Sequence, residues 1–440
     1  MGGGARTLEL TQPGFRHDVC SAILPMAAAS PVFRMLELER HGLELLHPPA
    51  PLAHPLDGEP PVMLECSVEA TAAGLARDAD GYRAMMAPAA ENVARTLPGL
   101  LTSPRLPPHP LALAPLAWRG LQPAARLAAR GFEGERARAL FGGLAAHSNM
   151  PLTSPLTSAF GLGLAALAHA VGWPVARGGS QAIADALASS LKELGGEIAT
   201  GRRVESIDEL PPARAYVFDV MPRQLLQIAG HRLPARYRRA LARYRYGPGA
   251  FKLDWALDGP IPWEHEACAR AGTVHLGGSF AEIAAAEDEV ARGRHPERPY
   301  VLVAQQSLFD PSRAPAGKHV AWGYCHVPNG SRFDMTARIE AQLERFAPGF
   351  RDRVVARSAI TPAEAERMNA NQVGGDFAGG LNSVRQIFFR PVTRAIPYAT
   401  PARDVFICSS AAPPGGGVHG ICGYLAARTV VRRLRRSRSA

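Results

Sequence analysis

The sequence predicts an α/β protein, and three stretches of the chain carry this prediction. Residues 172–230 run from a glycine turn through an amphipathic helix to short apolar strands, which is the order of an α/β unit. Residues 251–327 mix polar and apolar residues in strand-like runs, as in an antiparallel sheet with one covered face. Residues 78–146 are rich in alanine, leucine and arginine, which favours a helical cap.

The first of these stretches contains the clearest elements. A helix is expected from Gln181, ended by a glycine C-cap at Gly195 and Gly196. Its apolar face consists of Ile183, Leu187, Leu191 and Leu194. A short strand is expected at 197–200, a buried strand at 214–220 and a short helix at 224–229.

Other segments give coarser predictions. Prolines throughout 47–61 exclude a helix and predict an extended, edge-like path. Strands are expected at 301–304 and 319–324, and an amphipathic helix at 335–346. The apolar stretch 159–175, interrupted by glycine and proline, predicts either a core helix or a wall that faces a substrate.

The composition is that of a globular protein. The 440 residues are 47% apolar and 20% charged, and this length allows two or three domains. The net charge of +10 comes from 49 basic and 39 acidic residues. The basic residues show neither zinc-ligand spacing nor interleaved aromatic residues, so we expect no nucleic-acid partner.

Several motifs of other functions are missing or misplaced. Gly161 and Gly163 begin a GxGxxA pattern, but turn residues precede it and the next acidic residue is Asp185, so no phosphate-binding role is expected. The six cysteines include no CxxC pair, which predicts neither a metal site nor a redox dithiol. Because no secretory leader and no membrane-spanning apolar run is apparent, we expect a cytoplasmic protein.

Basic residues gather at the C-terminus, and two interpretations of this cluster stay open. The cluster comprises Arg428, Arg432, Arg433, Arg435, Arg436 and Arg438. It is either the solvated end of the last helix or a peripheral contact with anionic lipid. Each basic residue near such a surface contributes about 1 kcal/mol.

Glycines cluster near both ends of the chain. Gly2, Gly3 and Gly4 precede Arg6. The stretch 413–424 contains five glycines, follows a strand-like run and leads into a helix-like one. A glycine turn at a helix start lets main-chain N–H groups approach an anion or an electron-rich ring edge, because no Cβ intervenes. Both clusters are therefore candidate ligand-binding segments.

These clusters, together with the 173–180 turn, the region of Val204 and the stretches 371–376 and 385–391, resemble a known family. The chain is similar to the flavin-dependent phytoene desaturases. It is more similar to their branch of phytoene dehydrogenase-like, or pyridine nucleotide-disulfide oxidoreductase domain, proteins. The resemblance covers essentially the whole chain in the same order, which is more specific than any one motif.

The resemblance implies two interleaved domains. A Rossmann-like FAD-binding domain is expected from residues 1–30, 172–230 and 391–440. A substrate-binding α+β domain with an antiparallel sheet and a helical cap is expected from residues 31–171 and 231–390.

The chain departs from that family at its start. Members open with a strand, a GxGxxG turn, a helix and an acidic residue, a unit of roughly 30 residues. Here Met1 stands where the chain would enter the following glycine turn, so the FAD-binding domain is expected to be incomplete. We expect a misassigned start codon or a truncated gene, and the upstream DNA distinguishes the two.

The resemblance also implies the cofactor-binding residues. Gly2, Gly3 and Arg6 would lie beside the pyrophosphate and ribityl chain, because the fork of an arginine matches two phosphate oxygens. Val204 would face the adenine. The further expected contacts are Gly178 and Gly179 of the central turn, and Gly416, Gly417 and Val418, whose N–H groups would meet the flavin pyrimidine oxygen.

Each of these assignments has an alternative. The N-terminal glycines alternatively form a disordered terminus, Val204 a core strand residue, and the 416–418 turn a structural one. His419 is the candidate catalytic residue, as a proton relay beside the flavin, or else a packing residue. Arg385 and Arg390 hold a charged part of the substrate or cofactor, or form surface salt bridges.

The implied function is FAD-dependent oxidation. A hydride would pass to the flavin from a hydrophobic, isoprenoid-like substrate that enters through the helical cap. The alternative is a truncated, cofactor-free remnant that acts as a binding or scaffold protein. An amine oxidase ranks lower, because aromatic residues are only 7% of the chain and no paired tyrosines lie near the C-terminal glycines.

Overall fold

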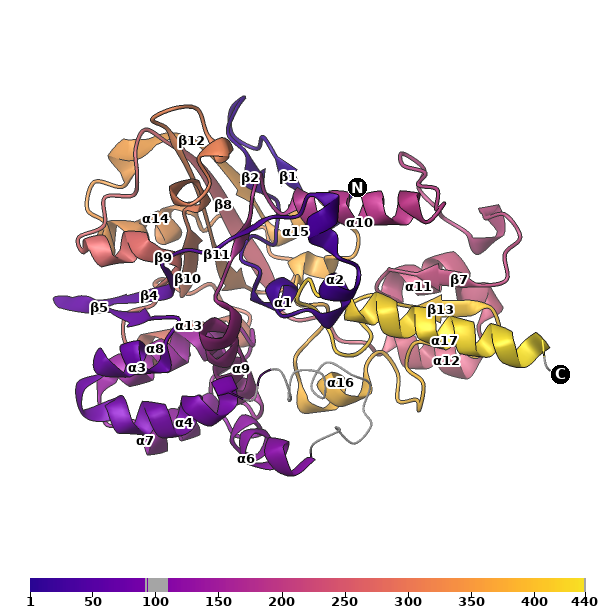
Figure 1. Ribbon diagram of the computed structural model, residues 1–440, viewed down its shortest axis with the longest axis horizontal. Coiled ribbons are helices and arrows are strands. Elements are labelled where there is room, and N and C mark those ends of the chain that lie inside the picture. Colours follow the sequence, from indigo (N-terminus) through magenta and orange to yellow (C-terminus); the bar gives the residue numbers. More distant parts are fainter. Residues whose placement is uncertain (92, 94–109, 439–440) are drawn as a thin grey trace.

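The computed structural model describes residues 1–91, 93 and 110–438, and its largest element is a seven-stranded sheet (Figure 1). In spatial order the strands are β12 Val354–Ile360, β8 Gly249–Leu257, β11 His319–Val327, β10 Val301–Ala304, β9 Ala271–Leu276, β4 Ala50–Leu56 and β5 Glu59–Leu64. Neighbours are antiparallel except β4 and β9, which pair in parallel. The predicted antiparallel sheet is confirmed.

Helices cover one face of this sheet and form the predicted cap (Figure 1). They are α3 Val68–Ala73, α4 Ala79–Glu91, α6 Pro110–Gly120, α7 Ala124–Gly131, α8 Glu135–Ala146, α9 Thr157–Val171 and α13 Phe280–Ala291. Phe141 and Leu162 of the cap share one apolar cluster with Leu302 and Trp322 of the sheet. The 159–175 stretch is thus largely a core helix, and residues 94–109 of the predicted helical stretch lie outside the described residues.

The opposite face packs against α14 Thr336–Phe346, the predicted amphipathic helix. Ile339 and Leu343 stand one turn apart and join Phe251 and Trp255 of β8 in a second apolar cluster. Burial of both sheet faces explains why few polar residues of β8 reach water.

The proline-rich segment forms a hairpin of β4 and β5. β5 is an edge strand as predicted, but β4 lies inside the sheet between β9 and β5. Pro55 is tolerated there because the register of β4 against β5 shifts between His54 and Leu56, where a ladder hydrogen bond is not required.

The remaining strands form three small sheets. β7 Tyr216–Phe218 pairs in parallel with β13 Val405–Ile407, β1 Thr7–Leu8 with β2 His17–Asp18, and β3 Leu45–Leu46 with β6 Val175–Ala176. The helices of this part are α1 Pro25–Ala28, α2 Pro31–Met35, α10 Gln181–Glu193, α11 Pro222–Ala229, α12 Ala235–Ala242, α15 Pro362–Met368, α16 Val384–Phe389 and α17 Ile421–Arg438. The predicted strand and both helices of 172–230 are confirmed, but the strand is not buried as predicted, since Val217 is exposed and Tyr216 only half-buried. The proposed domain limits stay a prediction.

Two local predictions in this part are wrong. Residues 197–200 form no strand, because no other described segment pairs with them and a strand needs a partner. The apolar face of α10 is only half buried, since Ile183 is inside whereas Leu191 and Leu194 are exposed. Both differences follow from the same cause: the described chain supplies nothing that covers this end of α10.

α17 carries the C-terminal arginines along its length (Figure 1). Arg433 donates to the carbonyl oxygens of Ala402 and Arg403, and its guanidinium lies over the Phe406 ring. None of the helices in the described ranges is both long enough and apolar enough to cross a bilayer. Contact of the remaining arginines with lipid stays a prediction.

Histidines are buried between the cap and the large sheet. His54 of β4 and His275 of β9 are fully buried, and the Nε2 atoms of His147 and His275 are 3.1 Å apart. His54 bonds through Nε2 to the carbonyl oxygen of Gly278 at 2.7 Å. Burial lowers the pKa of His54 to about 4 and that of His147 to about 3, because the charged ring would lose its hydration.

These depressed pKa values predict a pH dependence of stability. Between its unfolded pKa of about 6.5 and its folded pKa, His54 binds a proton only in the unfolded chain. Its stabilising contribution is therefore complete above about pH 6.5 and falls as the pH drops toward 4. In urea unfolding, the stability of the wild type relative to His54→Gln should decrease between about pH 7.5 and 4.5.

The exposed His47 provides the control, because its side chain meets water in both states. The wild type and His47→Gln should keep a constant difference over the same range. A constant difference for His54→Gln as well would contradict the prediction.

Candidate functional site

The N-terminal segment and the C-terminal glycine turn lie against each other. Ser30 donates through Oγ to the carbonyl oxygen of His419 at 2.7 Å. A Cβ placed on Gly420 would lie 2.8 Å from the Phe33 ring, and one on Gly417 would lie 3.3 Å from Met26. Residues 26–33 therefore pack against residues 417–420, although the two segments are almost 390 positions apart in the sequence.

The loop before α16 borders both glycine clusters. A Cβ on Gly3 would lie 4.0 Å from the amide nitrogen of Asn369, and one on Gly416 would lie 2.9 Å from the carbonyl oxygen of Ala378. Gly4 packs beside Cys20, since Ser21 donates its N–H to the Gly4 carbonyl at 3.1 Å. The N-terminal cluster therefore borders Asn369 and the C-terminal cluster borders Ala378, at opposite ends of the segment 369–378.

Partly exposed apolar side chains line the same region. Tyr324 of β11 and Phe377 meet edge to face, with ring centroids 5.3 Å apart. Met26 approaches from α1. This tyrosine–phenylalanine pair lies next to Ala378, which borders Gly416.

The glycine turn before α17 presents main-chain donors. Gly417 has φ of 137° and Val418 has φ of 52°, so the backbone turns sharply here. Among the hydrogen bonds of the described residues, none uses the N–H group of Gly416, Gly417 or Val418. These donors precede an 18-residue helix, whose N-terminal dipole end favours an anionic or electron-rich oxygen.

His419 is held as a neutral ring within this turn. Its Nε2 bonds to the carbonyl oxygen of Gly415 at 3.1 Å, and its Nδ1 accepts from the N–H of Ile421 at 3.1 Å. Burial lowers the pKa of His419 to about 4. Both nitrogens are occupied by the main chain, so His419 stabilises the turn, and its role in proton transfer stays a prediction.

Arg390 is a buried cation beside the turn. It donates to the carbonyl oxygens of Gln386 and Ser410 and to the amide oxygen of Asn382. No carboxylate of the described chain lies within ion-pair distance of its guanidinium, and a Cβ on Gly415 would lie 2.8 Å from Nη1. Arg390 therefore adds positive charge beside the turn, partly balanced by the buried Asp376 carboxylate, whereas Arg385 is exposed.

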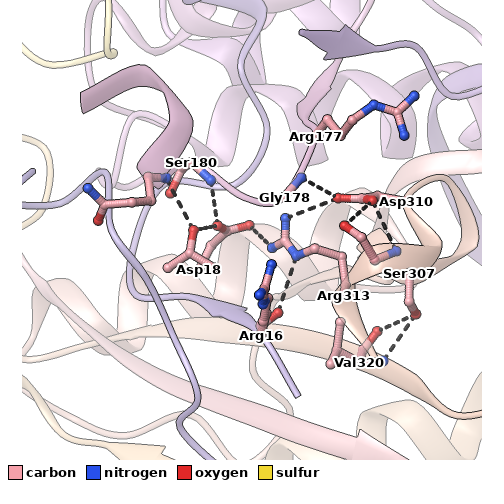
Figure 2. Close-up of polar contacts among 12 residues, drawn as sticks. Arg16, Asp18, Arg177, Gly178, Ser180, Ser307, Asp310, Arg313 and Val320 are labelled. Atoms are coloured by element: carbon pink, nitrogen blue, oxygen red, sulfur yellow. Dashed lines mark hydrogen bonds and ion pairs between the residues drawn. The ribbon is translucent and has the colours of Figure 1, made fainter. Parts of the chain in front are cut away.

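A second polar network holds the central turn to the N-terminal strand (Figure 2). Gly178 donates its N–H to Asp310 at 2.7 Å, and Ser180 donates its N–H to Asp18 at 2.8 Å. Asp18 also accepts from the Thr7 hydroxyl at 2.9 Å and pairs with the buried Arg313. Burial of the complete pair is tolerated because each charge has hydrogen-bonding partners.

This network gives Gly178 and Gly179 a packing function. The N–H of Gly178 is committed to Asp310, and the N–H of Gly179 is bonded to the Ala176 carbonyl at 3.0 Å. A Cβ on Gly179 would collide with the side chain of Thr7. The predicted cofactor contact of these two glycines stays a prediction, and their geometry is explained without it.

The other predicted residues are spread more widely. Gly2 and Gly3 form a tight turn in which Arg6 donates through Nε to the Gly3 carbonyl at 2.8 Å. Val204 is half-buried in a segment without regular structure, and no described hydrogen bond or ring contact joins it to the glycine turns. Gly2 lies beside Ala184 of α10 and Gly3 beside Asn369, so the contact of Gly2, Gly3, Arg6 and Val204 with a cofactor stays a prediction.

Two surface hollows lie away from this region. One, of about 450 Å³, is lined by Asp57, Glu297, Arg298, Arg338, Ala341, Gln342 and Arg345. The other, of about 280 Å³, is lined by Leu210, Pro211, Ala213, Ala215, Tyr216, Val217 and Phe218. No cluster of potential metal ligands occurs in the described part of the chain.

The sequence did not indicate the long-range side-chain contacts found in this part of the structure. Asp18 and Arg313 are 295 positions apart, so no local pattern connects them. Tyr324 and Phe377 come from a strand and a loop that no spacing relates.

The known proteins to which this chain is similar include several named as oxidoreductases. No family model matches the chain. "Pyridine nucleotide-disulfide oxidoreductase domain-containing protein 2" of Mus musculus, and that of Rattus norvegicus, are 27% identical over 333 residues, 64% of this chain and 56% of their own. The chain thus spans a little over half the length of these curated relatives.

Solved oxidoreductases share the fold across both chains. An oxidoreductase from Methanosarcina mazei matches with a TM-score of 0.61, covering 98% of this chain and 92% of its own, at 14% identity. Putrescine oxidase bound to putrescine matches at 0.60, covering 99% and 91%, at 14% identity. At this identity the likeness shows the fold alone, and the mixed α/β fold is that of these oxidoreductases.

The Asp18–Arg313 pair predicts a large loss of stability on substitution. Asp18→Asn removes the charge that compensates the buried Arg313 guanidinium, so the free energy of unfolding should fall by about 3–5 kcal/mol. Urea unfolding of the purified proteins measures this.

Glu44→Gln is the matched control, because Glu44 pairs with Arg177 of the same turn but both side chains are exposed. That variant should unfold close to the wild type. Equal losses for the two variants would show that Asp18 and Arg313 do not hold the turn through their charges.

Proposed function

We propose that the protein is an FAD-dependent oxidoreductase that moves a hydride from a hydrophobic substrate to the flavin. The observation that carries the proposal is the set of N–H groups at Gly416, Gly417 and Val418 without a hydrogen bond among the described residues, in a turn that borders Met26 and Ala378. The likeness to oxidoreductases in sequence and fold supports the same conclusion.

The residues of the turn fit one edge of a flavin. The three N–H groups would hold its pyrimidine oxygen, and the helix dipole with Arg390 would favour negative charge there. Arg6 would face the phosphates, whereas Gly178 and Gly179 are committed to the protein. Bound flavin supplies the two-electron acceptor, and the chain supplies orientation and exclusion of water.

The class of substrate is proposed from the side chains near the candidate flavin site. Met26, Tyr324 and Phe377 offer apolar and aromatic surface. Tyr324 also packs against the apolar cluster that contains residues of the cap helices α8 and α9. This lining suits a hydrophobic molecule, and the isoprenoid-like character comes only from the family resemblance. An amine is the competing substrate, because an aromatic pair is present and putrescine oxidase shares the fold.

The alternative of a cofactor-free binding protein has an observation in its favour. Val204 has no described contact with the turn, and the glycine N–H groups between β6 and α10 are already bonded to Asp310 and Ala176. Flavin binding separates the two proposals.

The purified protein mixed with FAD and desalted should retain the visible flavin absorbance. Gly417→Ala should lose it, because φ of 137° disfavours any side chain and a Cβ would press on Met26 and His419. The control is Gly423→Ala, two residues into α17, where a Cβ has open space.

Retention of FAD by both variants would contradict the proposed position of the flavin. A wild type without the visible band, even after FAD is added, would favour the cofactor-free protein instead.

A further inference from the structure

A histidine and a glutamate form a buried pair on the cap side of the sheet. His326 of β11 and Glu287 of α13 are each about 2% exposed. Nδ1 of His326 and Oε1 of Glu287 are 2.8 Å apart, and this is the one hydrogen bond that either side chain makes within the described ranges. The carboxylate therefore fixes the orientation of the ring.

The second ring nitrogen of His326 has no partner. In the neutral ring, Nδ1 carries the proton that the carboxylate accepts, so Nε2 holds a lone pair. Nε2 is buried, and no group of residues 1–91, 93 or 110–438 donates to it. An unpaired buried acceptor costs free energy, which a ligand with a donor group would recover.

The groups around His326 leave this nitrogen available. The Tyr300 hydroxyl already donates to the Gly143 carbonyl at 2.7 Å, and His147 is bonded to His275. The Tyr324 ring lies 5.8 Å from the His326 ring. Glu287 is the carboxylate that faces the imidazole from α13.

His326 also adjoins the candidate flavin site. Its ring lies nearly parallel to that of Phe377, at 6.2 Å and 19°. Phe377 in turn meets Tyr324, and the next residue, Ala378, borders Gly416. One aromatic side chain thus connects the imidazole with the turn that would hold the flavin.

We propose that His326, oriented by Glu287, is the proton acceptor for a hydroxyl group on the substrate. The proposal rests on the proposed function and narrows its substrate to an apolar alcohol. The O–H proton passes to Nε2 of His326, and the hydride leaves the carbinol carbon for the flavin. The carbon–oxygen double bond forms, so the alcohol is oxidised by two electrons and the flavin is reduced by two. Glu287 is a positioning residue.

The first test is binding, which needs no flavin. Hexan-1-ol and its isomer methyl pentyl ether differ in the O–H donor, and calorimetry measures their affinities for the wild type without FAD. We expect hexan-1-ol to bind several-fold to about tenfold more tightly, the contribution of one hydrogen bond. His326→Gln should abolish this preference.

The matched control is His54→Gln, because His54 is an equally buried histidine of the same sheet face but makes no ring contact with Phe377. It should keep the preference for the alcohol. Equal affinities for the two isomers in the wild type would overturn the proposal, and so would equal effects of the two substitutions. The wild-type comparison decides the matter even if a variant fails to fold.

The second test uses the protein loaded with FAD. Anaerobic flavin reduction by hexan-1-ol should slow by about a hundredfold or more in His326→Gln. In Glu287→Gln, the pH profile of reduction should shift to lower pH, because the imidazole loses its carboxylate. Reduction by hexylamine but not by hexan-1-ol, or an unchanged pH profile, would overturn the assignment.

These outcomes separate two failures. A wild type that does not retain FAD contradicts the proposed function. A wild type that retains FAD but shows no preference for the hydroxyl contradicts only the assignment of His326.

Discussion

The buried ion pair of Asp18 with Arg313 is the interaction on which the rest of the site depends. β1 and β2 contribute only two residues each, so their pairing alone orders little chain. Asp18 joins this short hairpin to the Ser180 turn, and Arg313 joins it to the loop that follows β10 (Figure 2). The pair sets the position from which residues 20–33 reach the C-terminal turn, because a buried charge without its partner would be strongly unfavourable.

The two halves of the site differ in how they are built. The turn before α17 presents main-chain donors, and its geometry comes from positive φ angles and from the neutral His419. The opposite wall is the rigid sheet, where β11 places Tyr324 and His326 two residues apart on one face. Phe377 contacts the rings of both Tyr324 and His326, and the next residue, Ala378, borders Gly416 of the turn.

Local sequence patterns predicted most of the helices and strands. They failed for segments whose structure depends on which other segment packs beside them. The strands at 301–304 and 319–324 and the helix at 335–346 were found, because their periodicity records burial against a sheet. The strand at 197–200 failed, since an apolar run becomes a strand only beside a partner. The position of β4 was also misjudged, because a bulge at Pro55 lets a proline-containing strand lie inside the sheet.

The sequence by itself determined the α/β class, the cap, and the glycine turn at 415–417, because φ preferences and hydrophobic period are properties of a few adjacent residues. It also placed His419 in that turn. Only the tertiary structure decided what these segments contact: His419 against the main chain, Gly179 against Thr7, and His326 against Glu287. Such pairings depend on how separate segments pack, and no local spacing along the chain encodes the distance between them.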